Sequence, residues 1–168
     1  MRAAFTPHIL NGALLLLLFG GGLWLYPTLP EQIPHHFDLY GQADAYGDAT
    51  LVRWLLLPIL AGFSAVCLYG PAWLLGTSEP NAEKQRVVTL LRRALYWMTT
   101  AMLTVMLAVQ VGVYVVATTA VTILPAAVGA TIVAGLLAIA GITGWLVWGL
   151  SQRDRALSGR DGGSPDDL

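Results

Sequence analysis

The sequence predicts an all-α membrane protein with four transmembrane helices and one structured outward loop. Of its 168 residues, 56% are hydrophobic and 11% are charged, whereas about 25% of the residues in a soluble domain are charged. The charges are also unevenly placed, because residues 3–30, 54–78 and 94–152 contain none. A helix needs about 20 apolar residues to cross the hydrocarbon core. The first two runs therefore hold one span each.

The third uncharged run is long enough for two spans and a turn. Three threonines in residues 117–122 and the following Pro125 mark the turn, because proline suits the first turn of a helix. We place the spans near residues 8–26, 52–76, 93–117 and 123–150, so that residues 1–150 form one membrane domain. We expect the polar tail, 151–168, to be disordered, since it lacks apolar residues to bury.

The first apolar stretch indicates a retained span rather than a cleaved signal peptide. It continues through Gly20, Gly21 and Gly22 without an A-x-A-like cleavage site. The glycine triplet favours either a close helix contact or a bend.

The basic residues predict the orientation, because positive charge near the ends of spans faces the cytoplasm. Only Arg53 lies on one side of the predicted spans. The other side holds Arg2, Lys84, Arg86, Arg92, Arg93, Arg153, Arg155 and Arg160. We therefore expect a multi-pass plasma-membrane protein with both termini in the cytoplasm and the 26–50 loop outside.

Small and polar residues within the spans predict how the bundle is held together. A stripe of small residues is the usual helix-contact device in lipid, and we prefer that interpretation to a substrate path. Gln110, in the third span, either hydrogen-bonds across the bundle or lines a cavity. The spans carry no mid-membrane charge, which disfavours a proton-coupled pump, and the net charge of −1 gives no basic excess for nucleic acid. The stripe consists of Ala126, Ala130, Ala134 and Ala138.

The outward loop is rich in proline, glycine and carboxylates. Its three prolines predict an extended path over residues 27–34, and Gly41 and Gly47 are predicted turns. Aromatic side chains of the kind found at membrane interfaces favour a loop folded back over the bundle. The carboxylates are Glu31, Asp38, Asp44 and Asp48.

His36 and Asp38 would point to the same side of an extended strand. With Asp44 or Asp48 added, three ligands for a divalent metal ion would be available. We favour the alternative that His36 and Asp38 hold the loop by hydrogen bonds to the backbone, since buried polar groups need partners. Arg53 either pairs with Asp48 or Asp44, or reaches towards lipid headgroups.

The loop reproduces the pattern LP-x-QIP-x-HF-x-x-x-G-x-x-D through Leu29-Pro30, Gln32-Ile33-Pro34, His36-Phe37, Gly41 and Asp44. Together with the preceding span, roughly residues 8–55, it resembles the bacterial membrane family called domain of unknown function 1648. That domain also begins proteins similar to the sporulation-delaying-protein immunity protein, which protect against a secreted peptide toxin. The resemblance implies a membrane protein without an assigned activity. Ala49 stands where members often carry lysine, and whether Arg53 replaces that lysine is open.

Our leading functional hypothesis is a non-enzymatic protein, without catalytic residues or a required cofactor, that recognises an extracytoplasmic ligand or peptide through this loop. The alternatives are a metal-dependent membrane enzyme that uses the loop histidine and aspartates, and a small permease subunit or scaffold for a partner membrane protein. The predicted ligand-binding or loop-structuring residues are Pro30, Gln32, Pro34, His36, Phe37, Asp38, Gly41, Asp44 and Arg53.

Overall fold

Four helices dominate the computed structural model, which describes residues 6–75, 82–119 and 121–158. Its candidate membrane spans are Pro7–Thr28, Leu51–Pro71, Val87–Thr118 and Ala126–Gln152. The four predicted spans are therefore confirmed, and the chain is a multi-pass membrane protein. In chain order the elements are α1 (Thr6–Leu16), the π-helix η2 (Leu17–Gly21), α2 (Gly22–Leu25), the 3-10 helix η3 (Tyr26–Thr28), β1 (Gln32–Phe37), β2 (Ala43–Asp48), α3 (Leu51–Leu75), α4 (Ala82–Thr118) and α5 (Ala126–Ser158).

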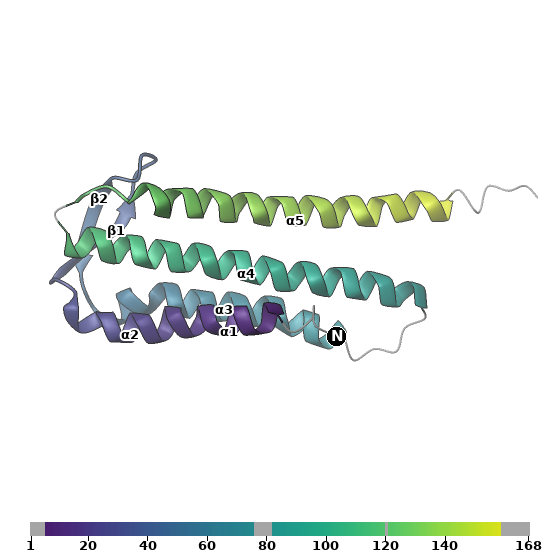
Figure 1. Cartoon of the computed structure of the whole chain (residues 1–168), viewed down its shortest axis with the longest axis horizontal. Helices are drawn as coiled ribbons and strands as arrows, with labels where there is room; N and C mark the ends of the chain where they lie inside the picture. The colour runs from purple at the N-terminus through teal and green to yellow at the C-terminus, as the bar shows by residue number, and fades with distance from the viewer. Residues whose placement is uncertain (1–5, 76–81, 120, 159–168) are drawn as a thin grey trace, which may run out of the picture.

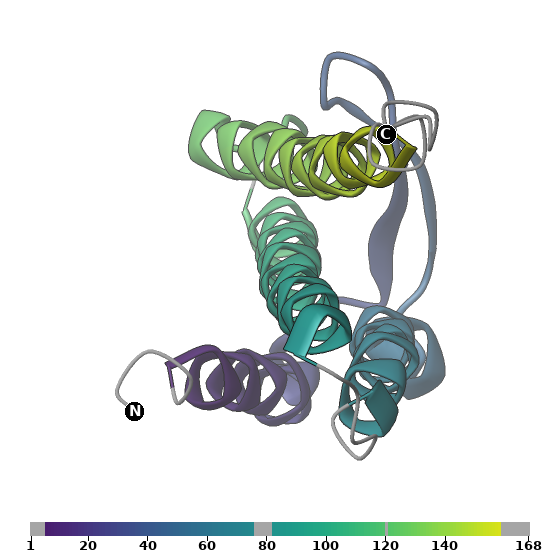
Figure 2. The ribbon, with the colours of Figure 1, turned by 90° about the vertical axis from the view of Figure 1, so that its right-hand side faces the viewer.

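The long helices lie side by side with α4 in the middle of the bundle (Figures 1 and 2). The first span and α3 pack on one side of α4, and α5 packs on the other. The β1–β2 hairpin and the connection from α4 to α5 share one end of the bundle, and the start of α1 lies towards the opposite end. The hairpin loop thus sits over one mouth of the bundle, as its sequence predicts.

Two helices extend further than their uncharged segments. α4 begins at Ala82, well before the predicted residue 93. α5 continues to Ser158, so the first part of the tail that we expected to be disordered is helical. Arginine, glutamate, alanine and leucine are good helix formers and allow a transmembrane helix to continue into water. Residues 159–168 of the tail lie outside the described residues.

The glycine triplet of the first span makes a close contact through only one of its members. Leu17–Gly21 form a π-helical turn, and Gly22, directly after it, is buried. A Cβ atom on Gly22 would lie 2.7 Å from Nε2 of Gln110. No atom stands within 4 Å of the corresponding position on Gly21. Gly22 therefore allows the first span to approach α4 closely.

The alanine stripe of α5 does not pack against the bundle, and this part of our interpretation is wrong. The side chains of all four alanines are exposed, whereas Val128 is buried and Gly135 fits against Val105 of α4. Several of the buried or half-buried residues of α5 recur every seven positions, which is the spacing found in left-handed helix packing. The face in contact with α4 is Val128, Ile132, Gly135, Ile139, Ile142, Leu146 and Gly149.

Two apolar clusters form the described core. Leu14, Leu18, Ala61 and Leu103 fill the middle of the bundle. The second cluster, called here the outer cluster, is Ile33, Trp54 and Val113 with the side chains packed around them, and it lies beneath the hairpin. The outer cluster joins the hairpin to α3 and α4, so the loop has a fixed position relative to the membrane domain.

Candidate functional site: the outer hairpin

The turn of the hairpin is built by Asp38 and Gly41. The Gly41 N–H donates to the Asp38 carbonyl at 3.0 Å, and the Asp38 N–H donates to the Gln42 carbonyl at 2.9 Å. Oδ1 of Asp38 accepts from the backbone N–H groups of Tyr40 and Gln42, each at 2.8 Å. Gly41 has φ +78°, a left-handed conformation that glycine adopts without steric cost. The turn predicted at Gly41 is present, whereas Gly47 lies within β2.

An irregular register brings His36 to Asp44. The strands pair Pro34 with Tyr46, His36 with Ala45 and Phe37 with Ala43, so the pairing shifts on both sides of His36. Such shifts change the direction in which a strand presents its side chains. Nδ1 of His36 lies 2.6 Å from Oδ1 of Asp44. The side chains are 65% and 46% exposed, respectively, so this pair lies open to solvent.

The inner face of the hairpin packs on the membrane domain. Ile33 is 2% exposed and forms the outer cluster with Trp54 and Val113. Pro34 is also fully buried, and Phe37 packs around the same cluster. These contacts explain why a two-stranded hairpin, which is only marginally stable by itself, is ordered here.

The other edge of β2 is tied to the connection between α4 and α5. The Ala43 N–H donates to the Thr122 carbonyl at 2.8 Å, and the Leu124 N–H donates to the Gly41 carbonyl at 2.9 Å. Gln42 and Ile123 form an antiparallel bridge. The sequence predicts only a turn near residues 117–122 and does not predict this contact. The predicted orientation places this turn and the 26–50 loop on the same side of the membrane, which is the one indication that they could meet.

Arg53 supports the end of β2 through the backbone. Its Nη1 donates to the Asp48 carbonyl at 2.7 Å. A Cβ atom on Gly47 would collide with this guanidinium, so the arginine lies directly against β2. Within the described residues Arg53 has no carboxylate partner: its contact with Asp48 is to the carbonyl oxygen, and Asp44 pairs with His36.

The outer face of the hairpin presents alternate residues of β2. Ala43 is buried, and the side chains of Asp44, Tyr46 and Asp48 are exposed. We call these three residues, with His36, the outer face. Hydrogen-bond acceptors and an aromatic ring stand there side by side, with no arginine or lysine among them. Tyr46 and Asp48 are the members of this face that our predicted ligand-binding residues omit, although their alternation with Asp44 indicates a shared side.

The structure separates the predicted site residues by role. His36 and Asp44 belong to the outer face, and Pro30 and Gln32 are exposed at the start of the hairpin. The remaining residues shape or hold the hairpin by the contacts described above: Pro34, Phe37, Asp38, Gly41 and Arg53.

The three candidate metal ligands are not brought together. His36 and Asp44 are in contact, but the carboxylate of Asp38 accepts the backbone hydrogen bonds of the turn. Across residues 6–75, 82–119 and 121–158, no group of three or more His, Cys, Asp or Glu side chains is placed to hold a metal ion. For Asp38 the arrangement agrees with our preferred interpretation, a hydrogen-bonding role in the loop, whereas His36 is held by a side chain.

Residues 13–62 match a family model described as Domain of unknown function (DUF1648). The match begins in α1, contains the whole hairpin and ends within α3. The family suggested by the loop pattern is therefore supported by this segment. The chain matches no curated protein and no solved structure.

Proposed function

We propose that this multi-pass membrane protein, whose residues 13–62 carry the domain of unknown function 1648, binds an extracytoplasmic ligand on the outer face of its hairpin. The observation that carries the proposal is that one face of the hairpin is packed against the bundle while the opposite face is exposed. Ile33 and Pro34 are buried against the bundle, while Asp44, Tyr46 and His36 point to solvent. A pre-ordered surface loses less conformational entropy when it binds a ligand.

A cationic peptide suits the charge of the outer face. Asp44 and Asp48 are exposed, and the nearest arginine, Arg53, donates to a backbone carbonyl instead of neutralising a carboxylate. Complementary charge raises the rate of encounter. Tyr46 adds an aromatic ring that stacks on arginine or lysine side chains. Such binding would suit an immunity-like or signalling-like role, in which the protein senses a secreted peptide.

The proposed location of the site follows from the distribution of positive charge. Lys84, Arg92 and Arg93 lie in the part of α4 remote from the hairpin, and such residues favour the cytoplasmic side. The hairpin would then face the outside of the plasma membrane. Reporter fusions at the α4–α5 connection and at the C-terminus test this orientation, and a cytosolic α4–α5 connection would contradict it.

Binding is tested with the purified chain in nanodiscs and a labelled arginine-rich peptide. We expect Asp44→Asn with Asp48→Asn to weaken binding about tenfold at low salt, because each exposed charge pair is worth up to about 1 kcal/mol. High salt should weaken wild-type binding in the same direction. Glu83→Gln removes one negative charge from the opposite end of the bundle and serves as the control.

The result that overturns the proposal is equal peptide affinity in the wild type and the double variant, with equal amounts of protein in the membrane. A loss of the same size in Glu83→Gln would assign the effect to net charge and would also contradict an outer-face site. His36→Gln tests the pair itself, since it retains a polar side chain and removes the imidazole beside Asp44.

A second candidate function, a membrane scaffold, is favoured by α5. Only 6% of an 18-residue window of its span is buried within the chain, and its alanine stripe is exposed. A stripe of this kind fits a partner membrane protein whose own helix carries small residues. Co-purification of one partner with the wild type and its loss in Ala130→Leu with Ala134→Leu would support this function. Ala127→Leu, off the stripe, is the control.

A further inference from the structure

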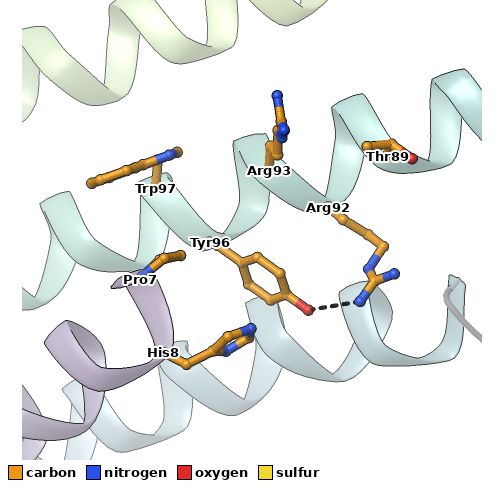
Figure 3. A pocket seen from close by; sticks show the side chains of 7 residues that line it. All are labelled: Pro7, His8, Thr89, Arg92, Arg93, Tyr96 and Trp97. Atoms are coloured by element: carbon orange, nitrogen blue, oxygen red, sulfur yellow. Dashed lines mark hydrogen bonds between the residues drawn. The ribbon is translucent and has the colours of Figure 1, made fainter. Parts of the chain in front are cut away.

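A cavity lies between α1 and the first part of α4, away from the hairpin. Its volume is about 420 Å³. Among the described residues, seven line it, and they include two arginines and one histidine but no carboxylate. The cavity therefore has a cationic lining. The residues are Pro7, His8, Thr89, Arg92, Arg93, Tyr96 and Trp97 (Figure 3).

Arg92 is the side chain whose hydrogen bonding is incomplete. Its Nη2 donates to the Tyr96 hydroxyl at 3.4 Å. Its Nε is buried and has no hydrogen-bond partner in the described part of the chain. A guanidinium group carries five N–H donors in one plane, and a buried charged donor without an acceptor is costly. An anion in the cavity would supply the missing acceptor after a rotation of the Arg92 side chain, since the buried Nε is not itself exposed to the cavity.

The aromatic groups hold the wall of the cavity in place. The His8 ring lies edge-on to Tyr96 with 4.6 Å between the ring centroids, and edge-on to Tyr69 at 5.6 Å. Figure 3 shows Tyr96 between His8 of α1 and Arg92, so the three side chains form one row. The cavity is therefore shaped by packing between α1, α3 and α4, and not by arginines alone.

Arg93 and Trp97 connect this cavity to an apolar one. They lie one helical turn apart on α4, and Figure 3 shows both pointing away from Arg92 and Tyr96. The second cavity, of about 320 Å³, lies between α4 and α5 and is lined by Arg93, Ala94, Trp97, Ile142 and Trp145. A cationic site thus stands beside an apolar groove, which is the arrangement that a headgroup and its acyl chain require.

We propose that the cavity binds the phosphate group of an anionic phospholipid. Arg92 would hold two phosphate oxygens through its planar donors, Arg93 would add a second positive charge, and an acyl chain would lie along the apolar groove towards Trp145. This site is separate from the outer face of the hairpin and does not depend on its function.

The depth of the cavity favours a lipid over a soluble phosphate. Arg92 lies near the start of the candidate span Val87–Thr118, a position from which a long arginine side chain would reach the membrane surface. Trp97 is 47% exposed, as expected of a tryptophan in the aromatic belt at a membrane interface. Basic pockets between transmembrane helices on the cytoplasmic side are typical sites for anionic headgroups, and the charge distribution of this chain assigns this end to the cytoplasm.

The test uses the full chain, delipidated in a neutral detergent. Phosphatidylglycerol or phosphatidylcholine with the same acyl chains is added, and bound lipid is counted by native mass spectrometry alongside the midpoint of thermal unfolding. We expect phosphatidylglycerol to remain bound and raise the midpoint, and phosphatidylcholine to do neither. Arg92→Gln should lower the affinity for phosphatidylglycerol about tenfold or more.

Two further variants make the result specific. Lys84→Gln removes the same charge from the same helix, about two turns before Arg92, and we expect its affinity to stay within about twofold of the wild type. Arg92→Lys keeps the charge without the planar donors and should give an intermediate affinity. If Arg92→Gln does not fold, Arg93→Gln takes its place.

Three results would overturn the proposal. The first is equal retention of the two lipids by the wild type. The second is a loss in Lys84→Gln as large as that in Arg92→Gln. The third is an equal rise of the unfolding midpoint with sodium phosphate alone, which would assign the cavity to a soluble anion.

Discussion

The indole N–H of Trp54 donates a 2.6 Å hydrogen bond to the carbonyl of Gly22. Trp54, near the start of α3, is 3% exposed. Gly22 directly follows the π-helical turn of the first span. The same carbonyl also accepts from the Tyr26 backbone N–H. One side chain therefore fixes the first span relative to α3 directly beneath the hairpin, and also forms part of the outer cluster.

Trp54→Phe is expected to destabilise the membrane domain by about 1 kcal/mol, the usual net value of one hydrogen bond. Trp54→Ala should cost about 3–5 kcal/mol, because it also leaves a cavity. Unfolding in mixed detergent and SDS, followed by circular dichroism, measures both. The control is Trp24→Phe, since Trp24 is 79% exposed in the same region of the bundle. A loss as large in the control would contradict the role given to this bond.

Gly41→Ala is expected to weaken the hairpin by about 1–2 kcal/mol, because an L-residue disfavours left-handed backbone. Gly41 has φ +78°. Gly41→Asn should be milder, as asparagine tolerates that conformation. Limited proteolysis of the 26–50 loop measures the effect, since a weakened turn is cleaved faster. Gly12→Ala, in α1 where no atom lies within 4 Å of the added Cβ, should be neutral or stabilising.

The sequence predicts the features that depend on residues close together in the chain. The four spans follow from long uncharged segments, and the turn at Gly41 follows from the residue itself. The partner of His36 does not follow, because the sequence predicts a regular strand as far as Asp38. The strand ends at Phe37, and the register shift beside His36 brings it to Asp44. A register shift depends on pairing across the hairpin, which a single strand does not reveal.

The packed face of α5 could not be predicted for a different reason. Nearly every residue of its span is apolar or small, so the alanine stripe and the face through Val128 and Gly135 are equally plausible from spacing alone. Side-chain fit decides between them: a Cβ atom on Gly135 would collide with Val105 of α4, and one on Gly112 of α4 would lie 2.9 Å from Val128 of α5. Lipid does not distinguish the two faces by polarity, because its tails are as apolar as leucine.

This fit predicts opposite outcomes for two neighbouring residues of α5. Gly135→Leu should separate α4 from α5 and lower the unfolding free energy by about 1–3 kcal/mol, the usual cost of overpacking. Ala134→Leu should leave it within about 0.5 kcal/mol, because Ala134 is exposed. Equal stability of the two variants would contradict the orientation of α5.

Two buried amides provide the last prediction, because their surroundings differ. Asn11, 2% exposed, donates to the Tyr69 hydroxyl at 2.7 Å and accepts from the Thr100 hydroxyl at 2.7 Å. Gln110, 4% exposed, has no hydrogen-bond partner for either amide atom among the described residues. Asn11→Leu should therefore destabilise the protein by about 1–3 kcal/mol, because the buried Thr100 hydroxyl and the half-buried Tyr69 hydroxyl each lose a partner.

Gln110→Leu should be neutral or stabilising, since it replaces an amide without partners by an apolar side chain of similar length. The same mixed-detergent unfolding compares the two variants, and Asn11→Asp is avoided because it would add a buried charge. A clear loss of stability in Gln110→Leu would show that the amide has a partner, such as a water molecule or a bound ligand, between the first span and α4. That result would support the alternative in which Gln110 makes a hydrogen bond across the bundle.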